Sequence, residues 1–530
     1  MTVPMWLPDE QPTPAEQRLL RRLTTTRRLF GFLRLHRHHI FDVAFQERLA
    51  AMYRDTGAGA VPQPPAMMCL VILLQGYTGI SDREAVEMSV VDARWQLVLG
   101  CLGATEPAFS QGGLQQFRQR LIESNLDIDL LERTVEVARQ SKGVDWRKLP
   151  KSLRVAMDSR PLVGAGRVED TFNLLGHAAR KIARCAAELT DLSFEEVCRK
   201  SSATLLLAPS IKAGLDIDWS DPDEKAAALE TLVVQVRVLV EWTANAMNGD
   251  GFTGPITKYL SALDDVLEQN VDEEDGRMKL RQGVAADRRV SIEDEDMRHG
   301  RKSQSKLFNG YKEHVAIDID DGVILACAVT PANLSETEAA PELKAGVEAQ
   351  GFTISELSID RGYLASGIVD ELEAEGGEVV CKPWPAQNAQ GLFTKNDFVI
   401  EMKSLRITCP AGEKRRVVPG EVVKFGDACT SCSLRERCTT SLAGRTVKVA
   451  IDEKRHQQLR RAQRTGAGRR RLRERTSVEH RQAHLAARKG HRARFRGTRK
   501  NTFDLRRVAA VENLITAQRL ITLASTCSVF

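Results

Sequence analysis

The stretch from residue 308 to residue 382 permits few folds, because strand-like and helix-like segments alternate along it. Residues 314–319 and 323–330 have the apolar, alternating pattern of strands, and Asp320, Asp321 and Gly322 between them supply a hairpin turn. A hairpin followed by alternating helices and strands predicts a mixed α/β sheet. The segments that follow the hairpin are predicted as a helix, a strand, a short helix and a strand, over residues 335–350, 354–359, 367–376 and 378–382.

Two aspartates stand at the ends of predicted strands. Residues 153–163 form a short, β-compatible segment that contains Asp158 and is ended by Pro161, and Asp360 directly follows the strand over 354–359. Reactive groups in α/β sheets tend to lie at the carboxyl ends of strands. Each aspartate alone also fits a strand-end cap or an ion-pair partner. Residues 170–280 between them have a helical pattern, which we interpret as an insertion without chemistry of its own.

The N-terminal part, residues 15–125, has a helical pattern. An apolar helix over 66–77 is followed by a second helix over 82–90, which Ser81 and Glu84 begin with a capping box. Two helices joined by a short turn that contains glycine fit a DNA-reading helix-turn-helix or an ordinary packed pair. The apolar character of the first helix argues against its lying in a DNA groove.

Charge is concentrated in one segment of the chain. The net charge of the 530 residues is only +5, yet residues 454–507 contain 20 Lys and Arg against 3 Asp and Glu. This pattern is typical of a polyanion binder, and the excess of arginine favours forked contacts to phosphate. The alternative interpretation is a solvated basic helix or tail.

Composition excludes several classes of protein. An apolar fraction of 42% is too high for a mostly disordered chain. The apolar run over 66–74 is far shorter than the roughly 20 residues that span a bilayer, so no membrane association is expected. Residues 1–14 lack the pattern of a secretory leader, which predicts a cytoplasmic protein with reduced or metal-bound cysteines.

Glu479 is conspicuous because it lies inside the basic segment, on a helix predicted over 471–488. Its cationic neighbours, among them Arg475 and Arg481, favour the ionised carboxylate. If Glu479 met Asp158 and Asp360, divalent cations would relieve the repulsion, and hard oxygen ligands select Mg²⁺ or Mn²⁺. Two such ions support in-line phosphoryl displacement. The three residues are far apart in the sequence, and nothing local proves that they meet.

Several motifs, taken in order, resemble a bacterial insertion-sequence transposase of the DDE class, whose catalytic core is RNase H-like. Residues 64–121 are similar to the N-terminal domain of that family, and Arg475 precedes Glu479 by four residues in a basic helix. The other motifs are Ala156-Met157-Asp158-Ser159, Asn309-Gly310-Tyr311-Lys312-Glu313-His314-Val315, Val329-Thr330-Pro331-Ala332-Asn333 and Ile359-Asp360-Arg361-Gly362-Tyr363.

The resemblance implies that Asp158, Asp360 and Glu479 are a catalytic triad that binds Mg²⁺ or Mn²⁺. It implies a DNA transposase that binds the terminal inverted repeats of its element, cuts a phosphodiester bond and joins the freed end to target DNA. The family's Tyr and Lys positions on the Glu479 helix hold Leu472 and Ala486 here. The residues expected to bind DNA are Arg361, Arg475, Arg481, Arg488 and Lys489.

A homodimer is expected, because two element ends must be paired. The protein is expected in the bacterial cytoplasm, associated with the nucleoid when bound to DNA. Two alternatives remain open: a metal-dependent nuclease on the same fold, and a DNA-binding descendant of a transposase with an idle triad.

Four cysteines form a separate signal. Cys409, Cys429, Cys432 and Cys438 lie within thirty residues with the spacing C-x19-C-x2-C-x5-C. Four thiolates suit tetrahedral Zn²⁺ in a structural site, because four protein ligands leave no open position. The alternative is a set of free thiols in a reducing cytosol.

The predicted fold class is α/β: an RNase H-like mixed sheet with an N-terminal helical domain, a helical insertion and a Cys-rich, β-leaning insertion. The predicted domains are an N-terminal helical DNA-binding or dimerisation domain, the first part of the core, the helical insertion, the core hairpin and strands, the Cys-rich insertion, and the basic C-terminal helices that complete the core, over residues 1–145, 150–169, 170–300, 301–384, 385–450 and 451–530.

Overall fold

The structure is a computed structural model, and it describes residues 3–23, 28–54, 61–141, 149–246, 254–274, 277–303, 305–385 and 391–527. Its α-helices are α1 (Pro14–Arg22), α2 (Arg28–Ile40), α3 (Val43–Ala50), α4 (Pro65–Thr78), α5 (Asp82–Val91), α6 (Ala93–Leu99), α7 (Gln111–Glu123), α8 (Leu126–Gln140), α9 (Thr171–Thr190), α10 (Phe194–Lys200), α11 (Ile211–Leu215), α12 (Pro222–Ala246), α13 (Pro255–Asn270), α14 (Ala340–Glu348), α15 (Gly367–Ala374), α16 (Glu453–Arg464), α17 (Gly466–Lys489) and α18 (Thr498–Cys527).

The strands are β1 (Ser152–Val163), β2 (Val271–Glu274), β3 (Arg277–Leu280), β4 (Arg298–Arg301), β5 (Leu307–Asp318), β6 (Ile324–Pro331), β7 (Thr353–Ser358), β8 (Glu378–Val380), β9 (Val399–Glu401), β10 (Arg406–Thr408), β11 (Lys414–Arg416), β12 (Val422–Lys424) and β13 (Thr446–Lys448).

The central sheet is mixed, as the sequence predicts. Its strand order is β6–β5–β1–β7–β8, and the short strand β4 pairs with β5 on the same edge as β6. The pairs β6–β5 and β5–β1 are antiparallel, whereas β1–β7 and β7–β8 are parallel. The hairpin, the strand that carries Asp158 and the strand that leads to Asp360 are therefore neighbours in an RNase H-like sheet.

Two segments differ from the helical insertion that the sequence predicts. Residues 271–274 form β2 and pair with β3 in an antiparallel hairpin directly after α13. Residues 298–301 form β4 and pair with residues 307–310 of β5. Sequence patterning missed β4 because Arg-His-Gly-Arg has no apolar alternation, and only its pairing with β5 makes it a strand.

The hairpin β5–β6 confirms the turn predicted at residues 320–322. One position on it accepts only glycine. Gly310 has φ 153°, and a Cβ placed there would lie 2.1 Å from the backbone oxygen of Leu162 on β1. The close approach of β5 to β1 therefore depends on the absence of a side chain at this point.

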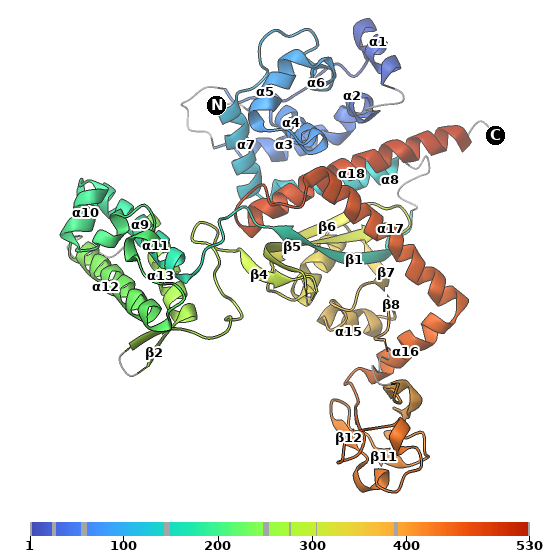
Figure 1. Cartoon of the computed structure of the whole chain (residues 1–530). Coiled ribbons are helices and arrows are strands. Elements are labelled where there is room, and N and C mark those ends of the chain that lie inside the picture. The colour runs from blue at the N-terminus through green and yellow to red at the C-terminus, as the bar shows by residue number, and fades with distance from the viewer. Residues whose placement is uncertain are drawn as a thin grey trace.

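The N-terminal helices, the sheet and α18 share one hydrophobic core. Helices α8 and α18 lie between the sheet and the other N-terminal helices (Figure 1), and α18 packs against α4, α8 and β6. Ser81 and Glu84 form the predicted capping box of α5. Residues 65–76 of α4 are all buried, which favours an ordinary packed helix pair over a groove-reading one.

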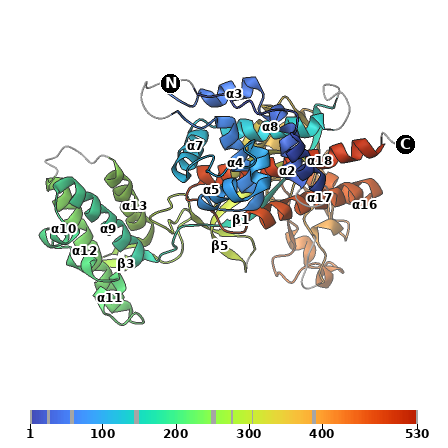
Figure 2. The same cartoon turned by 90° about the horizontal axis from the view of Figure 1, so that it is seen from above.

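Two further units have small cores of their own. Helices α9–α13 pack around one of them and lie to one side of the sheet in both views (Figures 1 and 2). Strands β9–β13 form the other unit at the end of α16, away from the central sheet (Figure 1). In the described part of the chain, none of the helices has the length and apolar content needed to cross a membrane.

Candidate active site

The carboxyl ends of β1 and β7 lie at the same edge of the sheet, because the two strands are parallel. Asp360 follows β7 by two residues, as predicted, whereas Asp158 lies within β1 and not at its end, because this strand continues past Pro161 to Val163 in its pairing with β5. Helix α17 contacts β1 and β8 and brings Glu479 to this edge. Asp158, Asp360 and Glu479 line one open cleft of about 780 Å³. The structure thus brings together the three carboxylates that the resemblance selected.

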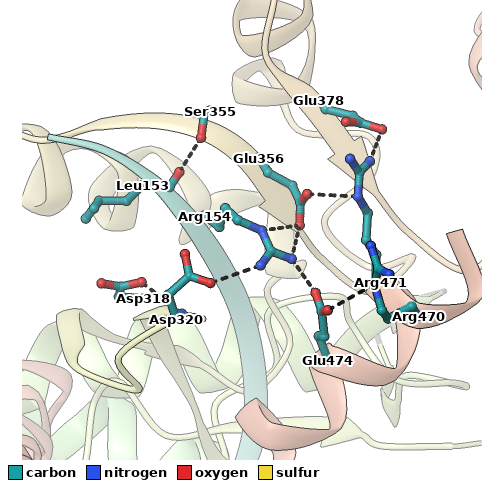
Figure 3. Close-up of polar contacts among 10 residues, drawn as sticks. All are labelled: Leu153, Arg154, Asp318, Asp320, Ser355, Glu356, Glu378, Arg470, Arg471 and Glu474. Atoms are coloured by element: carbon teal, nitrogen blue, oxygen red, sulfur yellow. Dashed lines mark hydrogen bonds and ion pairs between the residues drawn. The ribbon is translucent and has the colours of Figure 1, made fainter. Parts of the chain in front are cut away.

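A bulge in β7 sets the register of the two aspartates. Leu153 pairs with Ile354, but Arg154 pairs with Glu356, so Ser355 is the extra residue. The Ser355 hydroxyl donates a hydrogen bond to the Leu153 carbonyl oxygen at 3.0 Å (Figure 3). The pairing of Arg154 with Glu356, continued along both strands, places Asp360 level with Asp158. Because side chains alternate between faces, a slip of one residue would send one of these carboxylates to the opposite face.

Arg475 lies between the two aspartates. Its Nη2 atom is 3.1 Å from Oδ1 of Asp158 and 4.0 Å from Oδ2 of Asp360. The pKa of Asp158 is raised to about 6, chiefly by burial; the charge of Arg475 opposes the rise, and the negative charges of Asp360 and Glu479 add to it. The carboxylates of Asp158, Asp360 and Glu479 therefore repel one another within the cleft, and Arg475 partly relieves this repulsion.

The three carboxylates do not close around a common point. Glu479 is exposed, and across the described residues no group of three or more His, Cys, Asp and Glu side chains is arranged to hold a metal ion. The guanidinium of Arg475 fills the space beside Asp158 where a cation would be attracted. A divalent ion held by Asp158 would therefore compete with Arg475 for this carboxylate.

A buried hydrogen-bonded chain reaches the cleft residue Ser159 through Tyr363. The ring of His314 bonds to the Tyr363 hydroxyl at 2.7 Å and to the Thr330 hydroxyl at 2.9 Å. Burial lowers the pKa of His314 to about 3, so the ring is neutral. Burial also raises the pKa of Tyr363, with the Asp158 charge as the next cause. Sequence reasoning quoted His314 and Tyr363 within motifs but gave them no role.

The predicted DNA-binding residues have different surroundings. Arg361 lines the cleft, donates to the Lys382 and Pro383 carbonyl oxygens and lies over the Trp384 ring. Arg481 lies against the turn between β5 and β6, where a Cβ on Gly322 would be 2.8 Å from its Nη2 atom.

Two other predicted DNA-binding residues have partners within the fold. Arg488 binds Glu512 at 2.8 Å, and Lys489 is 2% exposed and pairs with Glu313 and Asp504. The sequence analysis assigned no role to Lys302 and Lys382, yet both line the cleft. The one available signal was that Lys382 follows β8 as Asp360 follows β7.

The four cysteines of the second predicted site gather around one small cavity. The backbone N–H groups of Glu413 and Arg445 donate to the sulfurs of Cys409 and Cys429, at 3.3 and 3.4 Å. Burial raises the pKa of the Cys438 thiol. All four are free cysteines, and they too are not arranged closely enough to count as a metal cluster among the described residues.

Two family models match the chain. The model described as a transposase DDE domain matches residues 279–514, and the model described as a transposase domain (DUF772) matches residues 19–120. Together the two matches span more than half of the chain, which belongs to the insertion-sequence DDE transposases. The DDE match contains Asp360 and Glu479, whereas Asp158 lies outside it and joins the site through the sheet. No curated protein and no solved structure matches the chain.

Proposed function

We propose that this transposase binds the terminal inverted repeats of its element, hydrolyses a phosphodiester bond at each end and transfers the freed 3′-OH to target DNA. The observation that carries the proposal is the convergence of Asp158, Asp360 and Glu479 on one open cleft, from segments far apart in the sequence. A merely structural role does not explain why three carboxylates face the same cleft with Arg475 among them.

The donor set fits a hard divalent ion, because all three groups are carboxylates and the cleft is open to water. Asp158, Asp360 and Glu479 would hold Mg²⁺ or Mn²⁺, which when bound supplies an activated water and charge stabilisation at the leaving oxygen. Arg475, once displaced from Asp158, is placed to bind the phosphate under attack. Lys302 and Lys382 line the same cleft and favour the approach of a polyanion.

The surface of the basic helices supports a DNA partner. Helices α16 and α17 carry exposed arginines and extend from the cleft toward the Cys-rich unit (Figure 1). Their exposed guanidinium groups are available to phosphates, so DNA binding is expected to weaken steeply with salt. Paired ends require at least a homodimer. The exposed arginines in question are Arg461, Arg464, Arg469, Arg470 and Arg473.

The test uses DNA that carries the element's own ends, together with a supercoiled target plasmid and Mg²⁺ or Mn²⁺. We expect cut ends and joined products, both of which disappear when the metal is chelated. Cutting without joining would instead identify a nuclease on the same fold. Specific binding of the ends without cutting would identify the DNA-binding descendant with an idle triad.

We also propose that Cys409, Cys429, Cys432 and Cys438 form a structural zinc site once the sulfurs close inward. Their common cavity supports this, as do the backbone N–H groups that face Cys409 and Cys429. The unit around them has only a small core, so a bound metal would add to its stability.

Metal analysis of the purified protein is expected to give about one zinc per chain, since four thiolates complete a tetrahedral site. Cys432→Ser should lose the metal and make residues 391–450 more sensitive to protease. Cys101→Ser in the N-terminal region is the matched control and should keep it. Wild-type protein without zinc would overturn the assignment.

A further inference from the structure

The first half of α17 is held on the sheet in an unusual way. From Gly466 to Arg475 none of its side chains is buried, whereas Val478, Gln482 and Leu485 in the second half are. The first half is therefore attached by polar contacts and not by an apolar face. Arg475 and Glu479 lie at the junction between the two halves, so these polar contacts bear on where both side chains point.

Arg154 is the centre of those contacts (Figure 3). It lies on β1, four residues before Asp158, and therefore on the same face of the strand. Its guanidinium donates to Asp320 in the turn after β5 at 2.9 Å, to Glu356 on β7 at 3.1 Å, and to Glu474 on α17. The hydrogen bond to Glu474 is the largest cause of the raised pKa of Arg154, and the bond to Glu356 adds to the rise.

A second arginine repeats the connection one helical turn earlier. Arg471 of α17 pairs with Oε2 of Glu356 at 3.3 Å and also with Glu378 on β8, while Arg154 uses Oε1 of Glu356. Glu356 is nearly buried, with 8% of its side chain exposed. Its carboxylate thus bridges an arginine of the sheet and an arginine of the helix (Figure 3).

This bridge depends on the bulge at Ser355. Without the extra residue, Ser355 and not Glu356 would stand opposite Arg154. The same irregularity thus sets the register of Asp158 against Asp360 and aims Glu356 at the two arginines. Sheet register and helix position are coupled through a single bulge.

We propose that Arg154 is a positioning residue of the transposase, which holds the first half of α17 on the sheet through Glu474 and so directs Glu479 toward the cleft. The expected effect on DNA cutting rests on the proposed function. The contact between Arg154 and Glu474, in contrast, is present in the protein without DNA. Charge pairs of this kind are weakened by salt and can open locally, unlike an apolar contact.

The test compares three variants of the full-length protein. Glu474→Gln removes the helix partner of Arg154, and Arg154→Lys keeps the charge but loses the forked geometry. Asp320→Asn is the matched control, because it also removes one carboxylate from Arg154 but lies in the turn and not on α17. Hydrogen exchange of residues 466–478 is measured without DNA or metal. In separate assays, the Mn²⁺ concentration needed to cut element ends and the affinity for those ends are measured.

In Glu474→Gln we expect about fivefold faster exchange over residues 466–478, which is the size expected for one partly exposed ion pair. The sheet strands should exchange as in wild type. The Mn²⁺ concentration for half-maximal cutting should rise by a similar factor, with unchanged affinity for the ends. Arg154→Lys should be intermediate, and Asp320→Asn should match wild type in both measurements.

Three results would overturn the positioning role. The first is hydrogen exchange of α17 at the wild-type rate in Glu474→Gln. The second is an equal increase in the exchange of α17 in Asp320→Asn. The third is faster exchange in the sheet strands as well as in α17. If wild type failed to cut any DNA, the proposed function would fall. The exchange comparison would still decide whether Arg154 holds the helix.

Discussion

Glu479→Gln is expected to lower metal-dependent cutting of element ends by about a thousandfold, because the loss of one ligand removes several kcal/mol of transition-state stabilisation. Glutamine has the size of glutamate and keeps one oxygen, but it carries no charge to hold a divalent ion. Glu479 is exposed and lies in the interior of α17, so the fold should tolerate the change. Affinity for the ends should stay within about twofold, since the variant removes a negative charge from a surface that binds a polyanion.

The measurement pairs a gel-based cutting assay with a binding assay on the same DNA. Asp360→Asn should behave like Glu479→Gln, because both residues line the cleft. Glu348→Gln is the control: this exposed carboxylate of α14 pairs with Lys344 at 3.3 Å and lies outside the cleft. Cutting by Glu479→Gln at the wild-type rate would remove Glu479 from the triad, whatever the fate of the other two carboxylates.

Local signals in the sequence were sufficient for much of the core. The hairpin turn at residues 320–322 and the capping box of Ser81 were found correctly, because alternation, turn residues and caps act over a few residues. Asp360 was correctly placed after the end of a strand, whereas the strand end predicted at Asp158 was wrong, because β1 continues past Pro161 to Val163 in its pairing with β5. That both aspartates face one cleft with Glu479 was implied by the resemblance to a family and not by any local pattern.

The bulge, β4 and the position of Arg475 could not be predicted from local patterns. Ser355 is extra only relative to β1, and residues 298–301 become a strand only because β5 offers them partners. Each depends on contacts between segments that are distant in the sequence. Arg475 was expected to contact DNA, and the structure additionally pairs it with Asp158, which composition could not reveal.

Lys489 shows the same limit among the basic residues. Composition treats the cations of residues 454–507 as one DNA-binding set, yet the side chain of Lys489 is turned inward. Its partners Glu313 and Asp504 come from β5 and α18, and both are 1% exposed. Arg160 also binds Glu313, so the buried cluster links β1, β5, α17 and α18. Charge density along the sequence cannot distinguish such a residue from an exposed neighbour.

Lys489→Met is therefore expected to destabilise the core by about 3–5 kcal/mol, the usual result of removing one member of a buried ion pair. Methionine fills a similar volume but leaves the carboxylates of Glu313 and Asp504 with less compensating charge. Because the chain has separate cores, unfolding should be followed in urea by hydrogen exchange of β5 and β6 and not by a whole-chain signal. The salt dependence of DNA binding should not change, since a buried ammonium neutralises no phosphate.

Lys500→Ala is the matched control, because Lys500 is an exposed lysine near the start of α18. It should change stability by less than about 0.5 kcal/mol, as is usual for a surface substitution. If Lys489→Met kept wild-type stability and instead reduced the salt slope by about one, Lys489 would contact phosphate directly. In that case α17 would have to turn in the DNA complex, because Lys489 shares this helix with Glu479 and faces the interior without DNA.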